Sequence, residues 1–185
     1  MTGRLGLFGG AFDPPHNGHV ALVRAAKEAL GLDRVVVVVS ADPGHKRVET
    51  PANVRLELTR AAFPDDDVVL DDHARTVDML RAHPEWRDAT FLIGADELEG
   101  FRDWKEPGEV LRLVKLGVAT RPGHAVELVD PERMEKFELE EPASSRSVRA
   151  RLERGEDAGD VIPEAVWGMI ERNGLYGRSS YTRTA

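Results

Sequence analysis

Gly9-Gly10-Ala11-Phe12-Asp13-Pro14-Pro15-His16-Asn17-Gly18-His19 stands near the amino end of the chain. This run follows the apolar segment Leu5 to Phe8, and its glycines and prolines predict that the strand stops and the backbone turns sharply. From Leu22 onward, apolar residues fall at the i, i+4, i+7 and i+8 positions of one helical face. The sequence therefore predicts a strand, a tight turn and the amino end of a helix, where unpaired backbone N–H groups attract anions.

His16 and His19 stand at this helix end and allow three interpretations. Metal ligation would need a third and a fourth ligand, and only Asp13 is near in the sequence. An ordinary loop would leave both histidines solvated. We favour a phosphate site in which two imidazoles and the helix end hold a polyphosphate, while Gly9 and Gly10 let the backbone approach closely. Neither GxxxxGK[ST] nor GxGxxG occurs, so the site is not a P-loop or an ordinary dinucleotide fingerprint.

The segment from Phe12 to His19 resembles the (T/H)xGH signature of the nucleotidyltransferase superfamily. Its double glycine and FDPxHNGH spelling are most similar to the bacterial nicotinate-nucleotide adenylyltransferase family. The resemblance runs from about Leu5 to Tyr176. It implies one Rossmann-like α/β domain with a parallel five- or six-stranded sheet and helices on both faces. We expect residues 1–176 to form this nucleotidyltransferase domain and residues 177–185 to form a flexible tail.

The composition is that of an ordinary globular protein. The 185 residues are 41% hydrophobic and 31% charged, and no apolar run approaches the length of a membrane helix. The net charge of −8 argues against nucleic acid and anionic lipid as partners, so a site for a phosphorylated ligand has to be locally positive. The chain has no cysteine and no signal sequence precedes the first strand; we expect a cytoplasmic protein. A homo-oligomer is compatible with the sequence.

The next elements continue a βαβ pattern. The run Val35 to Val39 predicts a strand buried on both faces, parallel to the first. Lys46 follows on a loop and should emerge at the same sheet edge as the histidines. The family has Pro-Pro-His-Lys here and uses the lysine on phosphate; without the resemblance, a solvated surface lysine is favoured. Further strands are expected at residues 68–70, 91–93, 114–120 and, at an edge, 137–139, and further helices after Thr50-Pro51 and after Pro163.

Several segments resemble the family's acceptor-binding blocks. Arg55 lies off the apolar stripe of its helix (Val54, Leu58, Ala61, Ala62), and by itself it predicts a solvated residue. Thr76 is a plausible helix N-cap in a turn that contacts the acceptor nucleotide in the family. Trp104 repeats at a spacing of three with Leu98 and Phe101, which is typical of a core face; in the family it stacks on the pyridine ring. The resemblance implies that the acceptor nucleotide is bound by Asp13, Arg55, Thr76, Gly94, Asp96 and Trp104.

A second phosphate block begins at Ala143. Serines before a helix are usually N-caps, but this helix also opens on Arg146 and Arg149, where the helix dipole disfavours cations. An anion bound there would explain them, and the family grips ATP phosphates with this block. The resemblance implies that ATP is bound by Gly9, Gly10, Phe12, Gly18, Arg121, Ser144, Ser145 and Arg146, and that catalysis depends on His16, His19, Lys46 and Arg149.

The resemblance implies transfer of an adenylyl group from ATP to nicotinate mononucleotide, with release of pyrophosphate. The ionised acceptor phosphate needs no general base, and Mg²⁺ would be held through the ATP phosphates rather than by protein side chains. Ala11, Arg75 and Arg146 replace family residues, as does Asp42-Pro43-Gly44. The alternatives are another acceptor, such as nicotinamide mononucleotide or phosphopantetheine, and a nucleotide-binding sensor without catalysis.

Overall fold

A computed structural model describes residues 3–44, 48, 50–123, 127–140 and 145–177, apart from the side chains of Ser145 and Arg146. Six strands form one sheet: β1 (Leu5–Gly10), β2 (Arg34–Ser40), β3 (Asp67–Asp71), β4 (Thr90–Gly94), β5 (Lys115–Thr120) and β6 (Met134–Glu138). The helices are α1 (Asn17–Leu30), α2 (Ala52–Ala62), α3 (Thr76–Ala82), α4 (Ala95–Glu99), α5 (Pro107–Leu113), α6 (Ser145–Glu153) and α7 (Glu164–Asn173), with 3₁₀ turns η1 (Pro84–Trp86) and η2 (Phe101–Asp103).

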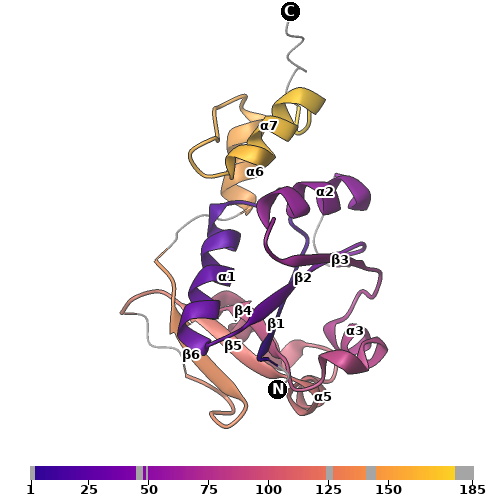
Figure 1. Ribbon diagram of the computed structural model, residues 1–185, viewed down its shortest axis with the longest axis vertical. Helices are drawn as coiled ribbons and strands as arrows, with labels where there is room; N and C mark the ends of the chain where they lie inside the picture. Colours follow the sequence, from indigo (N-terminus) through magenta and orange to yellow (C-terminus); the bar gives the residue numbers. More distant parts are fainter. Residues whose placement is uncertain (1–2, 45–47, 49, 124–126, 141–144, 178–185) are drawn as a thin grey trace, which may run out of the picture.

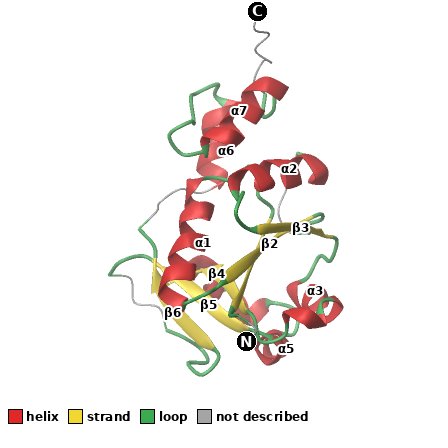
Figure 2. Ribbon diagram, in the orientation of Figure 1, coloured by secondary structure: helices red, strands yellow, loops and turns green. Residues whose placement is uncertain are grey.

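The sheet is parallel throughout and has the strand order β3-β2-β1-β4-β5-β6 (Figures 1 and 2). The chain builds outward from β1 to β3 and then returns to β4 on the other side of β1. Such a reversal leaves a crevice at the carboxyl ends of β1 and β4, which is where doubly wound proteins bind ligands. The predicted Rossmann-like α/β fold is confirmed, with six strands.

Helices cover both faces of the sheet, and each face has its own core. In β2, Val35, Val37 and Val39 pack into one core with residues of α1, α2, α6 and α7. Val36 and Val38 point into the other core, with residues of α3 and α5. Alternate side chains of a strand point to opposite faces, so a continuous valine run is stable only when both faces are covered.

The turn after β1 differs from the prediction. We expected Gly9 and Gly10 to end the strand, but both pair with β2, opposite Val38 and Val39. A Cβ on Gly9 would stand 3.1 Å from the Phe91 ring, and one on Gly10 would stand 3.0 Å from the Phe12 ring. The glycines therefore make room for aromatic rings within the strand. The turn itself uses Phe12 in the left-handed region (φ 48°) and a cis Asp13–Pro14 bond.

Some element ends also differ from expectation. α2 begins at Ala52 after Pro51, one residue later than predicted, and α3 is capped by Arg75 rather than by Thr76. The edge strand β6 begins at Met134, earlier than residue 137. The last helix ends as expected, with Gly174 in the left-handed region (φ 61°). Within the described part of the chain, none of the helices is long and apolar enough to cross a membrane.

Candidate functional site

His16 and His19 lie together at the amino end of α1. Their rings stack with centroids 3.7 Å apart and an interplanar angle of 24°. The Nδ1 atom of His19 accepts the backbone N–H of His16 (3.2 Å), which leaves the proton of a neutral His19 ring on Nε2. Phe12 is buried and packs edge-on against His19 at 5.0 Å. The pair is therefore held by its neighbours in one orientation.

Burial decides the charge of His16. The side chain is 4% exposed, and burial lowers its pKa from the usual 6.5 to about 4, so this imidazole is neutral at pH 7. Its Nδ1 atom is buried and has no hydrogen-bond partner among the described residues. The first turn of α1 also carries no acidic residue. A buried polar atom without a partner, at the positive end of a helix, favours an anionic ligand.

The metal interpretation of the two histidines is not supported by this geometry. One nitrogen of His19 is occupied by a main-chain N–H, and the rings face each other. Over the ranges that the structure describes, the one group of three potential ligands is Asp71, Asp72 and His73, at the end of β3. A His16–His19–Asp13 site is not among such groups.

Arg149 of α6 reaches the same turn. Its Nη1 atom donates to the main-chain carbonyl of Asp13 at 2.6 Å, across 136 residues of sequence. One N–H of the guanidinium is used in this contact, and the group has five. The two predicted phosphate blocks thus come together at the carboxyl end of β1.

The Asp13 carboxylate is buried and is not exposed to an acceptor nucleotide. It is 1% exposed, and one of its carboxylate oxygens accepts a hydrogen bond from the Tyr176 hydroxyl at 2.6 Å. An acceptor contact by Asp13 would require this buried carboxylate to be uncovered, and the residue is better described as part of the support beneath the histidines. In the sequence, Tyr176 stands out only as the end of the stretch that resembles the family.

The prediction of a solvated Arg55 is wrong. The side chain is 1% exposed and donates to four main-chain carbonyls: Ala11 at 2.6 Å, Ser40 at 2.8 Å, and Ala41 and Thr50 at 3.0 Å. Arg55 thus joins the ends of β1 and β2 to the start of α2, and contact with the acceptor stays a prediction. The spacing did hold a signal, because the buried stripe of α2 is Arg55, Leu58, Thr59 and Ala62. An arginine on that stripe should have suggested a buried guanidinium.

The other predicted acceptor residues lie after β3 (Thr76), at the end of β4 (Gly94) or after it (Asp96 and Trp104). Thr76 is partly exposed in the first turn of α3, and Asp78 of that helix binds Lys105 at 2.8 Å. This ion pair brings the start of α3 beside Trp104. The indole is partly exposed; it packs edge-on against Phe91 (6.3 Å) and at a tilt against Phe101 (5.2 Å). Trp104 is therefore anchored in the core and still reachable from solvent, as a stacking residue has to be.

A cavity of about 520 Å³ opens at the carboxyl ends of β4 and β5. Gly94, Asp96 and Arg121, which were predicted to bind the substrates, all line it. Asp96 and Arg121 are exposed there. This cavity therefore joins residues assigned separately to ATP and to the acceptor.

The remaining predicted residues fall into two groups. Gly9 and Gly10 are partly exposed at the end of β1. Phe12 is buried, so any contact with ATP would come from its main chain, and Gly18 is buried in the first turn of α1. Four others cannot be located: Lys46 and Ser144 lie outside the described residues, and only the main chain of Ser145 and Arg146 is described.

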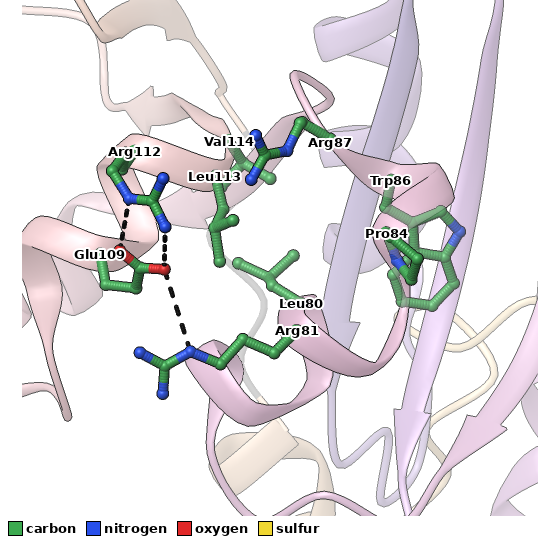
Figure 3. A pocket seen from close by; sticks show the side chains of 9 residues that line it. All are labelled: Leu80, Arg81, Pro84, Trp86, Arg87, Glu109, Arg112, Leu113 and Val114. Carbon is green, nitrogen blue, oxygen red and sulfur yellow. Dashed lines mark hydrogen bonds and ion pairs between the residues drawn. The ribbon is translucent and has the colours of Figure 1, made fainter.

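A second cavity, of about 310 Å³, lies near the amino ends of β4 and β5. Figure 3 shows the side chains that line it. In it Glu109 lies between Arg81 and Arg112, which are its ion-pair partners. None of the predicted site residues lines this cavity. Of the predicted site residues, Gly94, Asp96 and Arg121 line the carboxyl-end cavity instead.

The chain is similar to several known proteins. The profile of the cytidylyltransferase-like family matches residues 7–151. A protein of Thermus thermophilus named "Probable nicotinate-nucleotide adenylyltransferase" is 37% identical over 185 residues, covering 94% of this chain and 99% of that protein. One of the same name from Clostridium tetani is 31% identical, covering 92% and 97%. Nicotinic acid mononucleotide adenylyltransferase of Plasmodium falciparum, complexed with NaAD, shares the fold with a TM-score of 0.76 at 17% identity, covering 97% of this chain and 100% of that one.

Proposed function

The chain belongs to the cytidylyltransferase-like family and, within it, to the nicotinate-nucleotide adenylyltransferases, and we propose on this premise that it transfers an adenylyl group from ATP to nicotinate mononucleotide. The products are pyrophosphate and nicotinate adenine dinucleotide, a precursor of NAD. The observation that carries the proposal is the hydrogen bond from Arg149 to the carbonyl of Asp13, which brings a cation of α6 to the turn that presents His16 and His19.

The reaction needs alignment and charge neutralisation rather than proton transfer. An oxygen of the acceptor phosphate bonds to the α-phosphorus of ATP, while the bond from that phosphorus to the bridging oxygen breaks and pyrophosphate leaves with the electron pair. The acceptor phosphate is already ionised, so no side chain has to act as a base. Residues that hold the triphosphate in line and stabilise the departing charge supply the catalysis.

His16 and His19 have different parts in this scheme. Neutral His16 offers a hydrogen bond to phosphate without a charge, since burial holds its pKa near 4. His19, with Nδ1 occupied by the His16 N–H, would use Nε2–H as its donor to the ligand. The positive charge comes from Arg149, and Lys46 was predicted from the sequence to add a second cation.

Mg²⁺ enters this proposal with ATP, as part of the substrate. Imidazole and guanidinium groups do not suit Mg²⁺, which prefers oxygen ligands, and the Asp13 carboxylate is engaged by Tyr176. The ATP phosphates and water would therefore hold the ion.

A pyrophosphate-release assay tests the function directly. Wild-type protein with MgATP should release pyrophosphate with nicotinate mononucleotide and form the dinucleotide. Nicotinamide mononucleotide and phosphopantetheine should give much lower rates. Equal or faster release with either of them would reassign the acceptor. ATP binding without release for any acceptor would indicate a sensor.

A further inference from the structure

Tyr176 is a partly buried titratable residue that the proposed mechanism does not use. Its hydroxyl donates to the Asp13 carboxylate at 2.6 Å, and the ring packs against the core formed with α1, α2, α6 and α7. Burial, with the hydrogen bond to Asp13, raises the pKa of Tyr176 far above its usual value, so the hydroxyl keeps its proton. Tyr176 therefore acts as a permanent donor to this carboxylate.

Tyr176 belongs to a C-terminal segment, residues 145–177, that makes three further hydrogen bonds to the turn between β1 and α1 (residues 11–17, here called the histidine turn). Arg149 donates to the main-chain carbonyl of Asp13. The backbone N–H of Asn17 donates to the carbonyl of Val161 at 2.9 Å, and its side-chain amide donates to the carbonyl of Asp160 at 3.2 Å. In Figure 1 this segment, with α6 and α7, extends beyond α2 at one end of the molecule. The turn is thus held from outside, by residues that follow it by more than 130 positions.

The turn needs such support because its backbone is unfavourable. Phe12, next to Asp13, has a φ of 48°, and bulky residues leave this region unless their surroundings hold them there. The ring of Phe12 packs against His19, so a shift of this residue moves the imidazole. A hydrogen bond on the Asp13 side chain is in a position to prevent that shift.

We propose that Tyr176 is a positioning residue, which acts through Asp13 to hold His16 and His19 in the geometry that the reaction requires. This inference rests on the proposed function. It assigns to the turn after α7 a part in the alignment of the triphosphate, beyond its part in the core. The hydroxyl alone carries the effect, so removing that one atom should be enough to reveal it.

The test compares Tyr176→Phe with Asn173→Ala. The first removes only the hydroxyl and keeps the ring in the core. The second removes a different hydrogen bond at the end of α7, three residues before Tyr176, from the Asn173 amide to the carbonyl of Met169 (2.9 Å). This bond does not involve the turn between β1 and α1. For both variants and wild type, kcat and KM for ATP are measured with nicotinate mononucleotide, and amide hydrogen exchange is followed across the chain.

Tyr176→Phe should lower kcat by about 10- to 100-fold, because small misplacements of catalytic groups have effects of this size, while KM for ATP changes by less than about threefold. Exchange of the amides between residues 12 and 19 should become about tenfold faster, with the sheet amides unchanged. Asn173→Ala should match wild type in both measurements.

Two results would overturn the inference: unchanged exchange in the turn of Tyr176→Phe, or faster exchange there with kcat intact. If wild type itself makes no dinucleotide, the proposed function fails. The exchange data still decide in that case whether Tyr176 holds the turn, since exchange does not depend on turnover.

Discussion

His16 gains its properties from the place where it is buried. A solvated histidine is part-protonated near neutral pH, but this one sits beneath its neighbours, stacked on His19, and stays neutral. Phosphate binding would bring negative charge to the ring and raise its pKa again. The residue is thus suited to respond to a ligand and contributes little charge without one.

The pH dependence of stability should report the burial of His16. The unfolded chain protonates this histidine near 6.5 and the folded chain only near 4, so the unfolded state binds more protons between these values. Stability therefore rises with pH across that window, and acidification from 6.5 to 4 should cost up to about 3 kcal/mol from this residue. Urea unfolding of wild type and His16→Gln at several pH values measures this loss of unfolding free energy. The variant should lose less stability on acidification; parallel curves would contradict the burial of the ring.

His19→Ala should lower turnover by about 100-fold or more, since it removes a donor aimed at the triphosphate. The melting temperature should stay close to that of wild type, because the ring is only partly buried. His83→Ala is the matched control: that histidine stacks on Trp86, at the carboxyl end of α3. Turnover in His19→Ala close to the control would remove the basis for assigning the site.

At the scale of elements, Arg55 shows how the carboxyl ends of the strands are kept in place. Strand ends leave carbonyls without sheet partners. In this chain one guanidinium satisfies three of them, those of Ala11, Ser40 and Ala41, together with the carbonyl of Thr50 before α2. Burial lowers the pKa of Arg55, while the Asp13 carboxylate favours its charged form. Because the fork of donors is rigid, a lysine would not reproduce these bonds.

Arg55→Ala should lower the free energy of unfolding by about 3 kcal/mol or more, because buried carbonyls lose their donors. In a chain of this length that corresponds to a melting temperature roughly 6–12 °C lower. Arg60→Ala, on the exposed face of the same helix, removes an ion pair with Glu57 and should change stability by less than about 1 kcal/mol. Calorimetry measures the melting temperatures of the two variants. Equal melting temperatures would mean that the hydrogen bonds of Arg55 do not stabilise the fold.

Elements with a strong local pattern were predictable, and those decided by distant contacts were not. The β2 valines, the amino end of α1 and the glycine cap of α7 follow from short-range rules. Gly9 and Gly10 were assigned to the turn because glycine disfavours strands, yet pairing with β2 and the space needed by Phe91 and Phe12 prevail. The link from Tyr176 to Asp13 spans 163 residues and leaves no pattern in a single sequence.

At the scale of the whole molecule, strand order explains why the site is where it is. The reversal between β1 and β4 puts the histidine turn beside the end of β4, where Gly94 and Asp96 open the larger cavity. The convergence of the two phosphate blocks was predicted from the basic start of α6 and the family resemblance. The contact that joins them, Arg149 to the carbonyl of Asp13, required the structure.

The most direct measurement is a crystal structure with a non-hydrolysable ATP analogue and Mg²⁺. The imidazoles of His16 and His19 and the guanidinium of Arg149 should all lie within hydrogen-bond distance of one triphosphate, at the carboxyl end of β1. A triphosphate bound at the opposite edge of the sheet, in the cavity beside Arg81 and Arg112, or touching only one of the two blocks, would contradict the account.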